Sequence, residues 1–130
     1  MNQWLAILYV AIGGAVGSVA RFKLAGLVMR PFIQWSFPVG TFTVNVLGCL
    51  VIGMLAAVGE KYQWFSNDAR LLLITGLLGG FTTFSAFGLE TFNLMRQGAL
   101  GIALAYAIAS VLCGLVCVAI GFWLIKSVSF

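Results

Sequence analysis

Long apolar runs separated by short polar stretches are the dominant pattern along this chain of 130 residues. A bilayer core about 30 Å thick requires roughly 20 apolar residues per helix, and four of the runs are long enough. They cover approximately residues 4–29, 39–58, 69–95 and 100–125. We therefore predict an all-α membrane protein in which residues 1–130 form a single domain of four transmembrane helices.

The third apolar run contains a cluster of glycine and hydroxyl residues that is typical of a broken helix. The cluster consists of Thr75-Gly76, Gly79-Gly80 and Thr82-Thr83-Phe84-Ser85. Non-helical backbone in mid-membrane is tolerated only where protein buries it or where it lines a hydrated cavity. We predict that this helix is broken at mid-membrane and that the break is a candidate ion site.

Composition supports the membrane assignment and excludes several classes of function. The chain is 62% hydrophobic and 8% charged, with a mean hydropathy of +1.12. Its net charge of +4 comes from scattered residues, whereas nucleic-acid binding would need a basic cluster. It has no histidine, and its three cysteines follow no metal-binding or disulfide pattern. Without a nucleophile–base pair or cofactor motif, we do not expect an enzyme.

The basic residues are almost evenly divided between the two predicted sides of the membrane. The side with both termini has Lys61, Arg70 and Lys126, and the other side has Arg21, Lys23, Arg30 and Arg96. Lysine and arginine asymmetry sets the orientation of a membrane protein, so a balanced chain can insert both ways. Two opposed copies would form an inverted repeat, and we predict an antiparallel, dual-topology homodimer.

The second span carries polar residues on one helical face. Thr41 and Asn45 are four residues apart, and Gly48 follows three residues later. An asparagine in mid-bilayer is costly unless it is paired or hydrated. Asn45 either makes a hydrogen bond to a neighbouring helix or presents an amide N–H donor to an anion path, and the residues alone leave both interpretations open.

Two phenylalanines follow the predicted break. Phe84 and Phe87 are three residues apart, with Ser85 between them. An aromatic ring has a positive edge, so ring edges can hold a dehydrated anion more weakly than a fixed cation would. Conduction requires such weak, multiple sites. The rings would otherwise only fill space; beside the glycine–threonine break, we favour the anion-contact interpretation.

Four further polar residues are candidates in the spans. Tyr106 and Ser110 lie one turn apart in the fourth span and either extend a polar track or bond to a neighbouring helix. Glu90 is an intramembrane acid, which is a functional candidate by default. Arg21 could pair with Glu90 or draw anions into a vestibule.

Three segments resemble the Fluc family of fluoride channels, also called CrcB proteins. They are Gly-Gly-Ala-Val-Gly-Ser-Val-Ala-Arg-Phe (13–22), Gly-Thr-Phe-Thr-Val-Asn-Val-Leu-Gly (40–48) and Gly-Gly-Phe-Thr-Thr-Phe-Ser-Ala-Phe (79–87). The similarity covers the whole chain, and the third motif is specific. Ala86, Gly88 and Gly114 depart from it, since many relatives have hydroxyl residues there.

The resemblance implies a passive channel that exports fluoride from the cytoplasm across a bacterial cytoplasmic (inner) membrane. It also implies an antiparallel dimer with two fluoride pathways and a structural sodium ion held by backbone carbonyls of Gly79 and Thr82 from both subunits. The implied pore residues are Asn45, Phe84, Phe87, Tyr106 and Ser110. The alternative is a small dual-topology multidrug or ion exporter. A multidrug exporter of this kind would need a lone acid in the first span, and residues 1–30 contain none.

Overall fold

The computed structural model describes residues 2–61 and 66–128, and all the regular secondary structure in them is helical. The centre of the polar connection between the second and third apolar runs, residues 62–65, lies outside the described residues. The elements, in chain order, are α1 (Gln3–Met29), the 3-10 turn η1 (Arg30–Phe32), α2 (Val39–Lys61), α3 (Asn67–Arg70), the π-helical segment η2 (Leu71–Leu78), α4 (Gly79–Phe81), α5 (Phe84–Arg96) and α6 (Leu100–Ser127).

Four stretches of the described chain are long and apolar enough to cross a membrane. They are Gln3–Phe32, Val39–Lys61, Asn67–Arg96 and Leu100–Ser127. The prediction of an all-α protein with four membrane-spanning helices is confirmed at this level. The predicted ends differ from the observed ones by a few residues, because helices continue into the polar residues at the interface.

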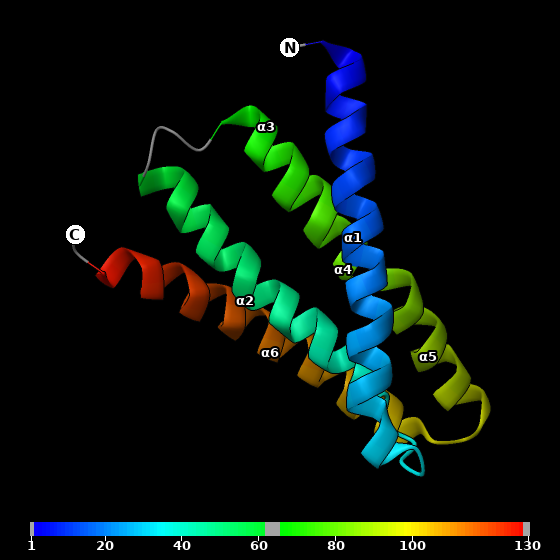
Figure 1. Ribbon diagram of the computed structural model, residues 1–130. Helices are drawn as coiled ribbons and strands as arrows, with labels where there is room; N and C mark the ends of the chain where they lie inside the picture. The colour runs from blue at the N-terminus through cyan, green and yellow to red at the C-terminus, as the bar shows by residue number, and fades with distance from the viewer. Residues whose placement is uncertain (1, 62–65, 129–130) are drawn as a thin grey trace.

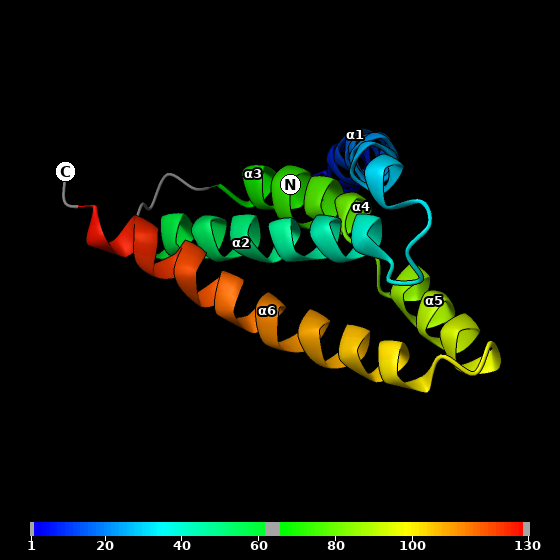
Figure 2. The same ribbon diagram turned by 90° about the horizontal axis from the view of Figure 1, so that it is seen from below.

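The four spans run alternately up and down. In Figure 1 the N-terminus and the start of α3 lie toward the top and the end of α6 toward the left, and the connections from α1 to α2 and from α5 to α6 lie toward the lower right. Figure 2 shows α1 on one side of α2 and α6 on the other. The packing is dominated by two helix crossings. In one, α1 crosses the third span; in the other, α2 crosses α6.

Glycines allow α1 to cross the third span with the two backbones in contact. A Cβ atom at Gly13 would lie 2.3 Å from the Leu72 carbonyl oxygen, and one at Gly17 would lie 2.0 Å from the Leu77 carbonyl oxygen. On the third span, a Cβ atom at Gly80 would lie 2.5 Å from the Gly14 carbonyl oxygen. Small residues spaced four apart permit this approach in membranes, where dispersion contacts replace the hydrophobic effect as the driving force.

The α2–α6 pair is built in the same way. A Cβ atom at Gly53 would lie 2.2 Å from the Val118 carbonyl oxygen, and one at Gly121 would lie 2.1 Å from the Leu50 carbonyl oxygen. An ion pair between Lys126 and Glu60, with 2.8 Å between Nζ and Oε2, joins the ends of the two helices. The helices α2 and α6 are therefore in close backbone contact, and an ion pair joins their ends.

Candidate functional site

The helical conformation of the third span is interrupted at two threonines. α4 ends at Phe81, Thr82 (φ −86°, ψ 157°) and Thr83 (φ −150°, ψ 117°) are extended, and α5 begins at Phe84. The Thr82 N–H still donates to the Leu78 carbonyl as in a helix (2.9 Å). Thr83 caps the next helix, since its Oγ1 accepts from the Ala86 N–H (3.2 Å). The depth of this interruption in the membrane stays a prediction.

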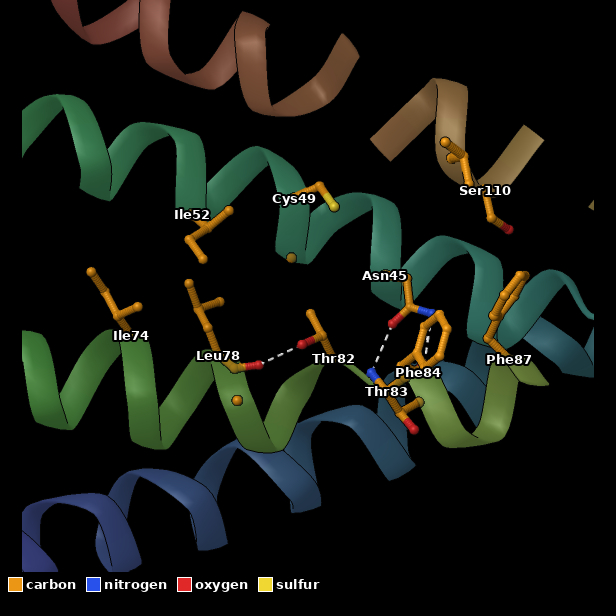
Figure 3. A pocket seen from close by; sticks show the side chains of 13 residues that line it. Asn45, Cys49, Ile52, Ile74, Leu78, Thr82, Thr83, Phe84, Phe87 and Ser110 are labelled. Carbon is orange, nitrogen blue, oxygen red and sulfur yellow. Dashed lines mark hydrogen bonds between the residues drawn. The ribbon is translucent and has the colours of Figure 1, made fainter. Parts of the chain in front are cut away.

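Asn45 on α2 holds the backbone of Thr83 through two hydrogen bonds. The Thr83 N–H donates to Asn45 Oδ1 (2.8 Å), and Asn45 Nδ2 donates to the Thr83 carbonyl (3.1 Å), as Figure 3 shows. Gly48 lets α2 come this close, because a Cβ atom there would lie 2.2 Å from Thr82 Cγ2. The interhelical hydrogen bond considered from the sequence is thus present, and it uses one of the two amide protons.

Residues of α1 bond to the carbonyl that precedes the interruption. Arg21 Nε donates to the Gly80 carbonyl (3.1 Å), and Ser18 Oγ donates to the same oxygen (3.5 Å). In a continuous helix this oxygen would accept from the N–H of Phe84. Polar groups from two other spans therefore replace the helical hydrogen bonds around Thr82 and Thr83.

A cavity of about 380 Å³ opens beside the interruption, and we call it the phenylalanine cavity. Figure 3 shows residues of α2, η2, α5 and α6 around it, together with Thr82 and Thr83. Ser110 Oγ is buried there and has no hydrogen-bond partner within the described residues. No charged residue lines this cavity among those described. Its polar and aromatic lining includes Asn45, Thr82, Thr83, Phe84, Phe87 and Ser110.

Aromatic rings continue from this cavity toward one end of the bundle. The ring centroids of Phe84 and Phe87 are 5.6 Å apart, those of Phe87 and Tyr106 are 5.1 Å apart, and those of Tyr106 and Phe37 are 5.2 Å apart. Phe84 is 84% exposed in the single chain, whereas Tyr106 is 0% exposed. Phe84 is therefore available to contact a second chain or an ion.

A second cavity of about 420 Å³ lies between α1, α2 and α5, and we call it the charged cavity. It is lined by Arg21, Thr41, Thr83 and Glu90, among others. The carboxyl group of Glu90 accepts two hydrogen bonds, from Thr41 Oγ1 (2.7 Å) and from the Tyr106 hydroxyl (2.8 Å). Glu90 thus connects α2, α5 and α6.

The two cavities separate the residues that the sequence grouped as one pore. Asn45, Phe84, Phe87 and Ser110 line the phenylalanine cavity. The Thr41 hydroxyl, on the polar face of the second span with Asn45, and the Tyr106 hydroxyl, a candidate for the polar track, are both directed to Glu90. Ser85 is exposed and absent from both linings, and its Oγ lies 3.4 Å from Thr83 Oγ1.

Arg21 and Glu90 line one cavity, but Arg21 bonds to a backbone carbonyl and Glu90 bonds to hydroxyls. Sequence reasoning assigned no individual role to Thr83 or Gly80. The signal for Thr83 was present, since a threonine just before a helical run is a typical N-cap.

Besides the Gly80 carbonyl, the interruption leaves the Gly79 and Thr82 carbonyls without their usual helical donors. In a continuous helix Gly79 O would accept from the Thr83 N–H and Thr82 O from the Ala86 N–H. Both N–H groups donate to side chains instead. The described residues contain no group of three or more His, Cys, Asp and Glu side chains that could hold a metal. Carbonyl oxygens suit a hard cation such as sodium. The Gly79 and Thr82 carbonyls, which are the predicted sodium ligands, therefore have donor atoms of the right kind.

Fold and site together define a small multi-pass membrane protein with an interrupted span beside two cavities. Residues 8–122 match the family model described as CrcB-like protein, Camphor Resistance (CrcB), and the chain belongs to this family. It is 58% identical to the fluoride-specific ion channel FluC of Methylobacillus flagellatus over 120 residues, which cover 92% of this chain and 94% of that protein. It is 42% identical to FluC of Helicobacter pylori over 121 residues, or 92% of each chain.

Proposed function

We propose that this protein is a fluoride-selective ion channel that exports cytoplasmic fluoride by passive permeation. The observation that carries the proposal is the 58% identity to a fluoride-specific ion channel over nearly the full length of both chains. The phenylalanine cavity adds a physical reason. It offers the unpartnered Ser110 hydroxyl and the rings of Phe84 and Phe87, with no charged side chain among its described lining residues.

Neutral donors suit the conduction of a small, strongly hydrated anion. A hydroxyl and an amide proton can replace part of the water shell, and aromatic ring edges add weak positive potential. A fixed cation at the same place would bind the anion tightly and slow its release. The second candidate, a multidrug exporter, has less support, because Glu90 already accepts two hydroxyl hydrogen bonds.

Ion efflux from liposomes that contain only this protein tests the proposal. We expect rapid fluoride efflux under a potassium gradient with valinomycin, and chloride efflux near that of protein-free liposomes. Equal fluoride and chloride fluxes would contradict selectivity. Fluoride flux that requires a proton gradient would contradict passive permeation and favour an exporter.

We further propose that the pore forms in an antiparallel homodimer in the cytoplasmic (inner) membrane of a bacterium. Three observations support a second copy: the balanced basic residues, the 84% exposure of Phe84, and a candidate pore cavity at the surface of the single chain. Side-specific labelling of terminal reporters is expected to find both orientations in similar numbers. One orientation in nearly all molecules would contradict the antiparallel dimer.

The third part of the proposal is a structural sodium ion between the subunits. Gly79 and Thr82 would hold it through backbone carbonyls, and its charge would balance the carbonyl dipoles without any acidic ligand. The two diverted N–H groups support this, because they free these oxygens for a cation. A high-resolution experimental structure in sodium should contain the ion between the subunits, and a dimer without it would contradict this part.

A further inference from the structure

The side-chain amide of Asn45 makes both of its described bonds to a single backbone unit. Oδ1 accepts from the Thr83 N–H and Nδ2 donates to the Thr83 carbonyl. This is the pattern with which a neighbouring strand would pair, and it requires the extended conformation that Thr83 has (φ −150°, ψ 117°). A helical Thr83 would turn its N–H and carbonyl in opposite directions along the axis, so one planar amide could not reach both.

The bond to the Thr83 N–H has a consequence one turn earlier in the chain. That N–H is the group that would close a helical hydrogen bond on the Gly79 carbonyl. The preceding N–H, of Thr82, still makes its helical bond to Leu78 (2.9 Å), so the change of partner begins at Thr83. Asn45 therefore takes the donor that would otherwise occupy Gly79 O.

Asn45 also belongs to the proposed pore. It lines the phenylalanine cavity with Phe84, Phe87 and Ser110, and Figure 3 shows its amide between the Thr83 backbone and that cavity. One amide proton is bonded to the Thr83 carbonyl, which leaves one for an anion. A single side chain thus contacts both the interruption and the wall of the cavity.

We propose that Asn45 is a positioning residue that couples the cation site to the anion path. By holding Thr83 extended, it keeps the Gly79 carbonyl available to sodium and places Phe84, the next residue, at the cavity. The cation in turn favours the conformation in which Asn45 is locked. This inference rests on the proposed sodium site but goes beyond it, because it assigns to a pore residue the control of cation binding.

Asparagine alone can make both bonds to Thr83, but only its acceptor oxygen is needed to keep the Thr83 N–H away from Gly79 O. Aspartate can accept from the Thr83 N–H but has no donor for the Thr83 carbonyl when ionised, and leucine can do neither. With leucine at position 45, the Thr83 N–H is free to return to Gly79 O and to compete with the cation. We therefore expect similar sodium affinity with asparagine or aspartate at position 45, and a lower affinity with leucine.

The coupling is tested by measuring how sodium stabilises the purified dimer. Four proteins are compared: the parent, Asn45→Asp, Asn45→Leu and Ser110→Ala. Thermal unfolding is followed over a range of sodium concentrations, with a large organic cation keeping the ionic strength constant. The parent and Asn45→Asp should be stabilised by sodium. Asn45→Leu should need roughly tenfold more sodium for the same stabilisation, the equivalent of one competing hydrogen bond.

Ser110→Ala is the matched control, since Ser110 lines the same cavity without bonding to the interruption. Its fluoride flux in liposomes should fall severalfold, and the sodium dependence of its stability should remain that of the parent. If Asn45→Leu also keeps that dependence while it loses flux, Asn45 is an anion contact only and the coupling is overturned. If the parent itself is not stabilised by sodium, the coupling fails together with the sodium site, whereas fluoride efflux by the parent decides the channel function separately.

A measurement on the parent alone applies if Asn45→Leu does not assemble. The Thr83 amide proton, bonded to Asn45, should exchange with solvent in sodium about as slowly as those of neighbouring helical residues. Removal of sodium should speed this exchange at least severalfold. Fast exchange at Thr83 in sodium, or no change on its removal, would overturn the coupling.

Discussion

The phenylalanine cavity and the charged cavity meet at Thr83, which lines both, and they differ in how fully their polar groups are hydrogen-bonded. In the charged cavity, Arg21 and Glu90 are bound to a carbonyl and to two hydroxyls. In the phenylalanine cavity, Ser110 Oγ is buried with no hydrogen-bond partner within the described residues. Asn45, Thr82 and Thr83 of the same cavity are hydrogen-bonded, so the difference concerns Ser110. It indicates that the charged side chains hold the spans together, whereas the Ser110 hydroxyl has bonding capacity left for a ligand.

Removal of the Glu90 carboxyl group should have the largest effect on stability. Glu90→Ala leaves the fully buried Tyr106 hydroxyl and the Thr41 hydroxyl without their partner. We expect the free energy of unfolding to fall by about 2–4 kcal/mol, because each buried unsatisfied group costs about 1–3 kcal/mol. Unfolding of the purified protein measures it, with Glu90→Gln as the control that retains an acceptor. If the two variants are equally stable, Glu90 does not hold the spans together.

Loss of the aromatic rings should have the largest effect on flux. Phe84→Ile and Phe87→Ile keep apolar bulk but remove the quadrupole, worth about 1 kcal/mol or more, so fluoride efflux should fall about fivefold or more. Phe92→Ile is the matched control, since Phe92 lies on the same helix but lines neither cavity. Size-exclusion chromatography checks that both variants are intact dimers. If such dimers conduct fluoride as well as the parent does, the two rings are packing residues only.

The Ser110 hydroxyl should matter for flux and not for folding. Ser110→Ala removes an anion donor, so we expect fluoride efflux to fall severalfold. The free energy of unfolding should stay unchanged or rise by up to about 1 kcal/mol, since a buried hydroxyl without a partner is lost. Ser127→Ala, at the exposed end of the same helix, serves as the control. A clear loss of stability in Ser110→Ala would mean that this hydroxyl holds helices together.

The smallest effect is expected for the charge of Arg21. Arg21→Gln should lower fluoride efflux about twofold at low ionic strength, and the difference should shrink as salt screens the charge. Lys23→Gln changes the net charge equally but removes an exposed cation two residues away. If both variants lower efflux alike, the effect comes from the overall surface charge, and the charged cavity has no special part in drawing anions.

Local properties of the chain were predictable from the sequence. The four spans follow from apolar runs of sufficient length, since hydropathy is a property of each segment alone. Small residues spaced four apart, as at positions 13 and 17 and at positions 76 and 80, are typical of close helix packing in membranes, and the backbones meet there. The cluster from Thr75 to Ser85 predicted non-helical backbone, but only Thr82 and Thr83 within it are extended, and the rest of it is helical.

Contacts between spans were decided by the tertiary structure. The sequence offered Arg21 as a partner for Glu90, but the fold brings it Thr41 and Tyr106, which are 49 and 16 residues away. It marked Asn45 as polar and in need of a partner, but only the crossing of α2 over the third span at Gly48 shows that the partner is Thr83. Periodicity tells which face of a helix is polar, whereas the residue opposite that face depends on how separate helices pack.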